Sequence, residues 1–345
     1  MSVLAEPRVL LPTHISGEPP PWGHVVHKLH GQTMGTTWSV RLVAPPGLRL
    51  APVQALVQQG CDEVVRQMSH WCSDSVLSRF NRLSPGQSLQ LPAAFAQVMD
   101  AALHIAEVSG GAYDPAAGEL VALWGFGPEG SRHQDAGFAP PTPERCAALP
   151  LAPWRELVWE PASARLTQGG RARLDLSSIA KGYAVDAVSE ALLDCGLPHH
   201  LVEIGGELRG HGFKPGAQPW WVALEPPHPQ LRTVPTRLAL HGLAVATSGD
   251  YRRCYLDAHG QHQSHTLDPR QRQPVRHALT SVSVLHPQAL WADGWSTALM
   301  VLGPEQGADL ARRLGLAALF VSRTEGAPEA PLQEWLSPAL QALVA

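Results

Sequence analysis

Short strand-like segments recur through the second half of the chain, and only three helical patterns separate them. The segments are rich in apolar and β-branched residues and lie between turn residues, at 156–160, 172–176, 200–204, 220–224, 243–246, 281–285 and 317–321. The helical patterns cover 178–194, 289–301 and 305–314. Parallel strands need a long crossover, usually a helix, so strands with few helices between them favour hairpins. We therefore predict an α+β fold of mixed, largely antiparallel sheets packed with helices.

The first half of the chain contributes fewer strands and two longer helices. A strand is predicted at 36–43 and helices at 52–69 and 92–108, the second helix ending at a Ser-Gly-Gly sequence. Residues 1–27 are Pro-rich and without periodicity, so we expect a disordered or irregular N-terminal arm there. Residues 126–153, dominated by Gly, Pro and Ala, read as an irregular excursion.

Composition and charge exclude several classes of protein. The 345 residues are 44% hydrophobic with a formal net charge of -4, and Lys and Arg form no cluster with aromatics, so nucleic acid is not an expected partner. No stretch approaches the roughly 20 apolar residues that span a bilayer. The five cysteines are scattered and never spaced Cys-x-x-Cys, which argues against a zinc site or a disulfide framework. The chain as written is expected to be cytoplasmic.

The run from Asp175 to Asp186 (DLSSIAKGYAVD) combines a strand end, a helix start and a turn of helix that contains a glycine. A helix N-terminus presents unpaired backbone N–H groups and a positive dipole end, which suit a phosphate. Ser177 or Ser178 is expected to cap the helix. The alternative is an ordinary capped strand-to-helix turn with no ligand.

A second candidate lies on the helix predicted at 289–301. Asp293 and Thr297 are four residues apart, so their oxygens share one face of that helix. A carboxylate and a hydroxyl at this spacing suit Mg²⁺ or Ca²⁺, with phosphate or water oxygens completing the shell. The alternative is a solvated polar face.

A third candidate is His265, which precedes an Asp-Pro turn at the end of a short predicted strand. A histidine exposed there has a near-neutral pKa in its ordinary state and suits proton transfer. The alternative is one more structural histidine among the 17 of the chain.

Taken in order, segments along most of the chain resemble the ApbE family, the FAD:protein FMN transferases or flavin transferases. They read MGTT from Met34, LSRFN from Leu77, GAYDP from Gly111 with LWGFG from Leu123, Asp175 to Asp186, VEIGG from Val202, ATSGDYR from Ala246, SHTLDP from Ser264 and ADGWST from Ala292. The resemblance implies one ApbE or T-fold-like domain over 28–345, in which two subdomains could meet at an FAD site.

The resemblance also implies an activity and a set of site residues. A member of this family uses Mg²⁺ to cleave FAD and attaches FMN through a phosphoester to a Ser or Thr of an acceptor flavoprotein subunit, releasing AMP. His265 aligns with the base for the acceptor hydroxyl. The implied metal residues are Ala180 through its carbonyl, Asp293, Ser296 and Thr297. The implied FAD contacts are Met34, Trp71, Ala112, Tyr113, Asp114, Ser177, Tyr183 and Thr266.

Three departures from the family pattern stand out. Trp71 occupies a position where a Tyr is common, and Ser296 one where an Asp is frequent. Many members are exported lipoproteins, whereas this N-terminus has no signal peptide or lipobox; a misassigned start would make the protein periplasmic or anchored to the inner membrane. Two other functions use nearly the same residues: an Mg²⁺-dependent FAD pyrophosphatase that yields FMN and AMP, and a non-enzymatic FAD-binding protein.

Overall fold

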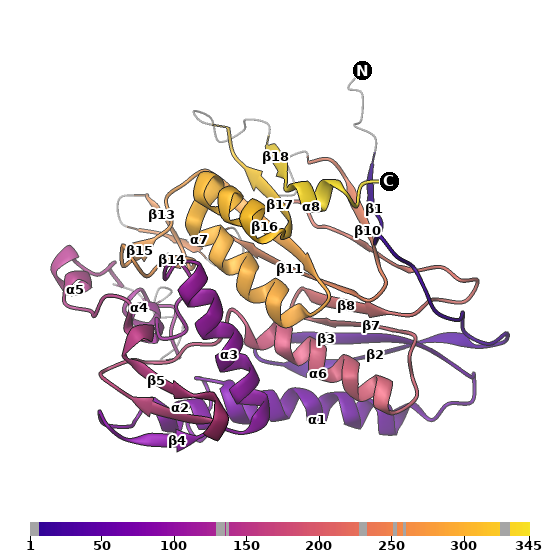
Figure 1. The fold of residues 1–345 in the computed structure, drawn as a ribbon, viewed down its shortest axis with the longest axis horizontal. Helices are drawn as coiled ribbons and strands as arrows, with labels where there is room; N and C mark the ends of the chain where they lie inside the picture. The colour runs from indigo at the N-terminus through magenta and orange to yellow at the C-terminus, as the bar shows by residue number, and fades with distance from the viewer. Residues whose placement is uncertain are drawn as a thin grey trace.

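The computed structural model describes residues 7–128, 135, 138–227, 233–250, 254–257, 260–324 and 332–345, and one eight-stranded sheet forms its centre (Figure 1). The strand order is β18-β17-β16-β11-β8-β7-β3-β2, with every neighbouring pair antiparallel. These strands are β2 (Val25–Thr33), β3 (Thr36–Ala44), β7 (His200–Ile204), β8 (Glu207–His211), β11 (Leu243–Gly249), β16 (Leu279–His286), β17 (Ala317–Ser322) and β18 (Gln333–Leu336). The predicted α+β class with largely antiparallel sheets is confirmed.

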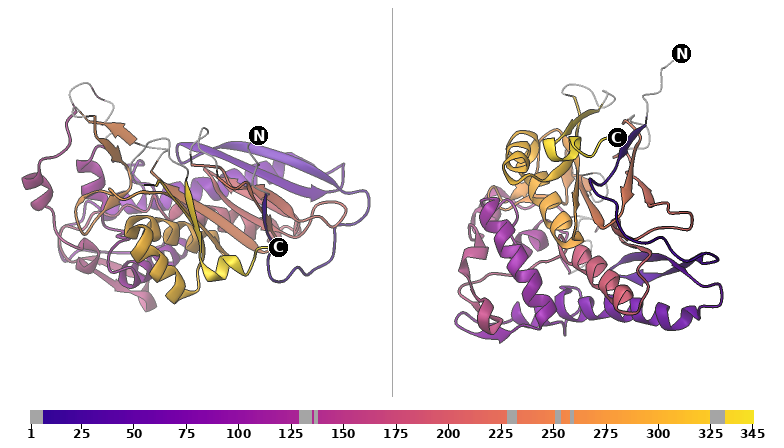
Figure 2. Two further views of the ribbon diagram at one scale, coloured as in Figure 1. Left: turned by 90° about the horizontal axis from the view of Figure 1, so that it is seen from above. Right: turned by 45° about the vertical axis from the view of Figure 1, so that its right-hand side comes forward.

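Helices cover one face of this sheet (Figures 1 and 2). Helices α1 (Leu50–Met68), α6 (Ala180–Asp194) and α7 (Ala289–Leu314) contact the strands, and α3 (Ala93–Val108) packs on α7 and α1. Helix α1 shows how the sequence produces this layer, because its buried apolar side chains recur at helical spacing. They are Val53, Val57, Cys61, Val64 and Met68. The main hydrophobic core lies between these helices and the sheet.

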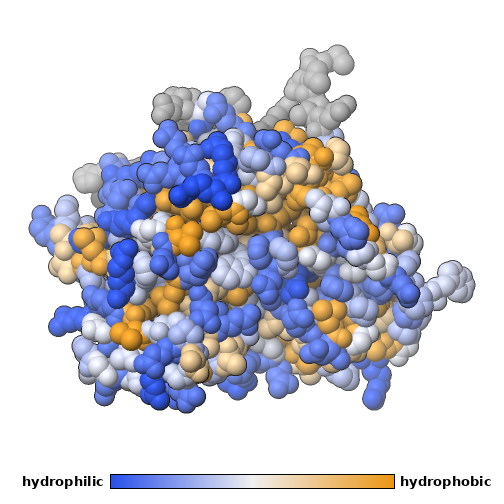
Figure 3. All heavy atoms as spheres, viewed as in Figure 1, coloured by the Kyte–Doolittle hydropathy of each residue, from blue (hydrophilic) through white to orange (hydrophobic). Residues whose placement is uncertain are grey.

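The other face of the sheet carries a second, smaller core. A three-stranded sheet of β1 (Arg8–Leu10), β10 (Thr236–Leu240) and β9 (Trp220–Ala223) lies on this side with the short helix α8 (Pro338–Gln341). Leu10, Trp220 and Leu340 are buried there against side chains of the large sheet. On the molecular face drawn in Figure 3, hydrophobic side chains gather most around α8 and are elsewhere interspersed with hydrophilic ones.

The remaining elements are short and surround one end of the helical layer (Figure 1). They are the sheet β4 (Ser88–Gln90), β6 (Arg165–Gln168) and β5 (Leu157–Glu160), the pairs β12 (Cys254–Leu256) with β13 (His262–Ser264) and β14 (Leu267–Asp268) with β15 (Gln273–Pro274), helices α2 (Val76–Phe80), α4 (Gly118–Leu123) and α5 (Pro143–Ala147), and the 3₁₀ turns η2 (Pro153–Glu156) and η3 (Pro161–Ser163). Within the described parts of the chain, no helix has the length and apolarity needed to cross a membrane.

Three segments differ from their predicted structure. Helix α5 (Pro143–Ala147) lies within the stretch 126–153, which was expected to be irregular. Residues 172–176 do not form a strand and make only one isolated β-bridge, at Arg173. The Leu174 N–H donates to the side-chain oxygen of Asn81, and the Leu174 carbonyl accepts from the side-chain N–H of Asn81. The Asn81 amide thus takes the place of a neighbouring strand. Within the expected irregular arm 1–27, Arg8–Leu10 pairs in parallel with β10, because burial of Leu10 in the second core holds it there.

Helix α7 includes both helical patterns that the sequence predicts, with a kink between them at Gly303 (φ 79°). Pro304 has no N–H to donate to the carbonyl of Met300, the residue four before it. The Nε2 of His277 lies 2.8 Å from that carbonyl oxygen and supplies the missing donor. The kink therefore leaves the Met300 carbonyl hydrogen-bonded.

Candidate active site

The Asp175 carboxylate organises the turn that leads into α6. It accepts a hydrogen bond from the Ser177 N–H at 2.9 Å, and His70 Nδ1 lies 3.3 Å from the same oxygen. Burial alone would raise the pKa of Asp175, but His70 and the Ser177 bonds outweigh it and lower that pKa to about 2. Helix α6 begins at Ala180, with Ile179 as its N-cap and no capping side chain, so the predicted cap by Ser177 or Ser178 is wrong. The Ser177 N–H bonds to Asp175 instead.

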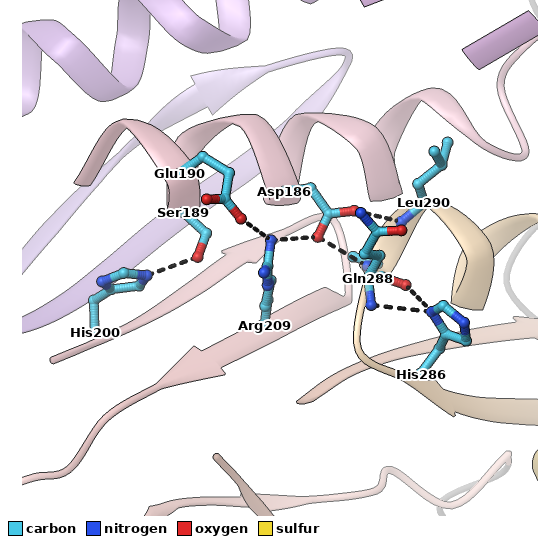
Figure 4. Close-up of polar contacts among 9 residues, drawn as sticks. Asp186, Ser189, Glu190, His200, Arg209, His286, Gln288 and Leu290 are labelled. Atoms are coloured by element: carbon cyan, nitrogen blue, oxygen red, sulfur yellow. Dashed lines mark hydrogen bonds and ion pairs between the residues drawn. The ribbon is translucent and has the colours of Figure 1, made fainter. Parts of the chain in front are cut away.

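The Asp186 carboxylate joins α6 to the start of α7 (Figure 4). Its two oxygens accept the N–H groups of Ala289 at 2.9 Å and Leu290 at 2.8 Å. These are first-turn donors of α7, whose own N-cap side chain makes no capping bond. Arg209 lies between Asp186, at 3.0 Å, and Glu190, at 2.8 Å. Asp186 thus caps a helix 103 residues away in the sequence.

A second link between α6 and α7 ends on the candidate metal carboxylate. The Gly182 N–H donates to Asp293 Oδ2 at 3.0 Å, and Asp293 is 3% exposed. The two helices are so close that a Cβ on Gly182 would lie 2.3 Å from the Ala289 carbonyl oxygen. The first turn of α6, which begins at Ala180, therefore lies against the turn of α7 that carries Asp293.

Three hydroxyls lie together where α7 faces β11. Ser248 Oγ is 3.0 Å from Thr297 Oγ1 and 2.8 Å from Ser296 Oγ, and the Ser296 hydroxyl donates to the Asp293 carbonyl at 2.9 Å. Ser296 is fully buried. The shared helix face predicted for Asp293 and Thr297 is thus packed against the end of a strand.

A buried ion pair lies beside this junction. Lys181 Nζ is 2.5 Å from Glu207 Oε1, and Glu207 Oε2 has no hydrogen-bond partner among the described residues. Burial raises the pKa of Glu207 to about 7 and also raises the pKa of Asp293, while the positive charge of Lys181 opposes both shifts. The positive charge of Lys181 therefore partly offsets the cost of burying the negative charges of Glu207 and Asp293.

Two tight hairpin turns meet next to α6. Met34 (φ 48°) and Gly35 (φ 70°) join β2 to β3, and Gly205 and Gly206 join β7 to β8 with φ of 62° and 106°. The Gly205 N–H donates to the Thr37 carbonyl at 3.1 Å. A Cβ on Gly205 would lie 3.3 Å from Cδ of Lys181. The turn that carries Met34 is thereby held close to the first turn of α6.

The Ala112 to Asp114 turn follows α3 and is almost entirely buried. The Tyr113 hydroxyl makes no hydrogen bond of normal geometry to the described residues. Burial raises its pKa, the Ser178 side chain opposes this shift, and the charges of Asp293 and Asp175 raise the pKa by smaller amounts. Asp114 accepts the Ala116 N–H at 2.8 Å, and burial raises the pKa of Asp114 to about 7. These charge effects indicate that Tyr113 lies near both Asp293 and the α6 turn.

His265 and Thr266 lie between β13 and β14. The half-buried His265 ring faces Phe126 edge-on, with ring centroids 6.3 Å apart, and the Thr266 N–H donates to Ser264 Oγ at 3.0 Å. Strand β14, which follows directly, contacts α7. The fold therefore brings the segment after His265 to the helix that carries Asp293.

Two further residues implied to contact FAD have accessible rings. Trp71 is 54% exposed, and its ring centroid is 5.4 Å from that of His70. Tyr183 is half-buried on α6, one residue after Gly182. Both rings are placed where they can contact a ligand on the α6 side of the fold.

Several residues of this region were missed or left without a role by the sequence reasoning. Ser248 lies in the ATSGDYR segment, where no role was assigned to it, and Lys181, Glu207 and His70 were given no function either. Of these residues, only Lys181 lies within the Asp175 to Asp186 motif, which is the one local sequence signal that could have pointed to it. Tyr251 and Arg252, at the end of the ATSGDYR segment, lie outside the described residues.

Comparisons with known proteins identify the family of the chain. Residues 34–320 match the family model described as the ApbE family. A protein named FAD:protein FMN transferase from Klebsiella pneumoniae is 34% identical over 90% of this chain and 87% of its own, and the one from Escherichia coli K12 is 32% identical over 92% and 88%.

Solved structures resemble the whole fold. The Pseudomonas stutzeri flavinyl transferase ApbE in its apo form superimposes with a TM-score of 0.81 at 36% identity, covering 93% of this chain and 97% of that one. The flavin transferase ApbE from Vibrio cholerae gives a TM-score of 0.79 at 31% identity, covering 93% and 99%. The family match, the identities and the shared fold together show that the chain is a member of the ApbE family.

Proposed function

We propose that the protein transfers FMN from FAD to a Ser or Thr hydroxyl of an acceptor protein in an Mg²⁺-dependent reaction that releases AMP. The observation that carries the proposal is the α6–α7 junction, where the Gly182 N–H holds the buried Asp293 carboxylate beside Thr297 and the first turn of α6. The names of the relatives, FAD:protein FMN transferases, support the same activity.

The residues at the junction fit a divalent cation. Asp293 offers a carboxylate, Thr297 a hydroxyl oxygen and Ala180 a backbone carbonyl, and hard oxygens of this kind are the ligands that Mg²⁺ prefers. Burial raises the pKa of Asp293, so the ionised carboxylate gains from a nearby positive charge beyond that of Lys181. Bound Mg²⁺ would neutralise charge on the pyrophosphate oxygens.

FAD would lie across the turns that meet at this junction. Trp71 offers an accessible indole face for stacking, and the Met34 turn lies beside α6. The other residues proposed to contact FAD are Ala112, Tyr113, Asp114, Ser177, Tyr183 and Thr266. Asp114 has a buried Oδ2 without a partner among the described residues, and a flavin or ribose donor would satisfy it.

His265 is proposed as the base. A Ser or Thr hydroxyl is a weak nucleophile, so its proton must move to a nearby group as its oxygen bonds to the FMN phosphorus. The imidazole of His265 takes this proton, the phosphorus–oxygen bond to the AMP half breaks, and AMP leaves with its phosphate oxygen. The proton that the acceptor loses thus stays on His265 until solvent removes it.

The test is to incubate the full chain with FAD, Mg²⁺ and a peptide that contains a Ser or Thr acceptor, and to analyse the peptide by mass spectrometry. We expect an added FMN on the hydroxyl, equimolar AMP, and loss of both when a chelator is present. Free FMN without an adduct on any acceptor would instead show a pyrophosphatase. Unchanged FAD would reduce the activity to flavin binding.

A further inference from the structure

The three hydroxyls between β11 and α7 form a hydrogen-bond chain whose direction can be worked out. Ser296 Oγ lies 2.9 Å from the Asp293 carbonyl oxygen, Ser248 Oγ lies 2.8 Å from Ser296 Oγ, and Thr297 Oγ1 lies 3.0 Å from Ser248 Oγ. Each hydroxyl has one proton to donate and two lone pairs that accept. The carbonyl at the end of the chain can only accept.

Counting protons leaves one arrangement. Ser296 must donate its only proton to the Asp293 carbonyl, so the contact between Ser248 and Ser296 requires Ser248 to donate. The Ser248 proton is then used, so the contact between Ser248 and Thr297 requires Thr297 to donate. The Thr297 proton is thus directed to Ser248, and the free lone pairs of Thr297 Oγ1 point away from the chain.

We infer that Ser248 and Ser296 are positioning residues that hold the Thr297 hydroxyl with its lone pairs, not its proton, directed at the divalent cation. This inference rests on the proposed function, because the cation is the one assigned there to Asp293 and Thr297. A hydroxyl binds a cation through a lone pair, and a proton turned toward the ion opposes binding. The chain therefore gives Ser296 a role in orienting Thr297 in place of the direct ligand role that the family resemblance implied.

Burial supports a fixed orientation. Ser296 is 0% exposed, and Ser248 and Thr297 are only partly exposed, so bulk water competes little for the inner bond of the chain. The chain also ties together two elements distant in sequence, since Ser248 is the penultimate residue of β11 and lies 49 residues before Thr297. Partners that orient a metal ligand in other proteins typically change metal affinity by about 10- to 100-fold when removed.

The same strand offers a matched control. Thr247 Oγ1 lies 2.8 Å from Ser283 Oγ, across the β11–β16 pair, and Ser283 is buried like Ser296 and more than Ser248 and Thr297. This bond joins two strands and contains none of the three hydroxyls of the chain. The Ser283→Ala variant therefore removes a buried hydroxyl bond of similar length without changing the orientation of Thr297.

The experiment measures Mn²⁺ binding to the full chain in the presence of FAD, from the loss of the free-ion electron paramagnetic resonance signal. Manganese is a suitable probe because oxygen ligands that hold Mg²⁺ also hold Mn²⁺. We expect Ser248→Ala and Ser296→Ala each to weaken Mn²⁺ binding by about 10- to 100-fold. Ser248→Thr, which keeps the hydroxyl, should restore affinity, and Ser283→Ala should bind as the wild type does.

A double variant tests the chain itself. Both single changes break one series of bonds, so Ser248→Ala with Ser296→Ala should bind Mn²⁺ about as weakly as Ser248→Ala alone. Wild-type affinity in Ser248→Ala, or additive losses in the double variant, would overturn the inference while the proposed function stands. If the wild type binds no Mn²⁺, or if Asp293→Ala does not weaken binding, the metal assignment itself fails.

Discussion

The backbone N–H of Gly182 donates to the Asp293 carboxylate at 3.0 Å, which joins the first turn of α6 to the second turn of α7. A side chain at position 182 has no room, because a Cβ would lie 2.3 Å from the Ala289 carbonyl oxygen and 2.8 Å from Cβ of Asp293. The glycine in the Asp175 to Asp186 motif is thus explained by helix packing at the candidate metal site.

The Gly182→Ala variant is expected to separate the two helices and displace Asp293. Overpacking of this kind typically costs about 1–3 kcal/mol of unfolding free energy, which urea denaturation measures. Mn²⁺ affinity should fall as well. Gly47→Ala is the control, since a Cβ at Gly47 meets nothing within 4 Å. Equal stability and metal affinity for both variants would contradict the close contact.

The Asp293→Asn variant is expected to lose transfer without losing stability. Burial raises the pKa of Asp293, so the ionised carboxylate costs folding free energy at neutral pH, and a neutral amide of the same shape removes that cost. We expect a Tm equal to or above that of the wild type in chelator. Mg²⁺ should raise the Tm of the wild type only, and FMN transfer should fall by at least about 10²-fold, as for removal of one strong electrostatic group. A large drop in Tm in chelator would mean that the carboxylate is mainly structural.

The His265→Ala variant is expected to bind FAD and transfer FMN poorly. A positioned base contributes about 10²- to 10⁴-fold to the rate, whereas the proposed flavin contacts, apart from the neighbouring Thr266, lie on other segments. Quenching of flavin fluorescence reports binding, and mass spectrometry of the acceptor peptide reports transfer. If the variant needs more FAD yet turns over normally at saturation, His265 is a binding residue.

The contribution of His200 to the free energy of unfolding is expected to fall as the pH drops from about 6.5 to about 4. His200 is buried, and its Nε2 lies 2.7 Å from the Ser189 hydroxyl (Figure 4). Its Nδ1 lies 2.7 Å from the Leu197 carbonyl oxygen. The carbonyl can only accept, so Nδ1 carries the proton and Nε2 accepts from Ser189. Burial lowers the pKa of His200 from 6.5 to about 4.

The sign of this pH dependence follows from proton binding. Between these two pKa values the unfolded chain binds a proton at His200 and the folded chain does not, so the His200 contribution to stability rises with pH in that window and is lost toward acid. The full difference corresponds to about 3 kcal/mol. The free energy of unfolding, measured by urea denaturation at several pH values, should increase less with pH in this window for His200→Gln than for the wild type. If the free energy of unfolding changes equally with pH in the two proteins, His200 is protonated in the folded protein.

Much of the fold was predictable because local patterns and tertiary packing agree. The strand predicted at 200–204 is β7, the helix predicted at 178–194 is α6 with its start two residues later, and helix α1 differs from its prediction by two residues at its start and one at its end. At 172–176 the pattern was misleading, since the hydrogen bonds of Leu174 go to the Asn81 side chain, 93 residues earlier. Side chains that replace a strand in this way leave no periodic signal.

The sequence alone determined which residue types are proposed to carry the chemistry: a carboxylate and a hydroxyl four apart on one helix, and a histidine before a turn. Only the tertiary structure decided how they are held, because the bonds that orient them come from distant segments. Asp186 caps α7 from α6, Gly182 holds Asp293, and Ser248 on β11 sets the direction of the Thr297 hydroxyl. Spacing along one helix places two oxygens on a common face, but the position of a proton depends on neighbours that only folding brings together.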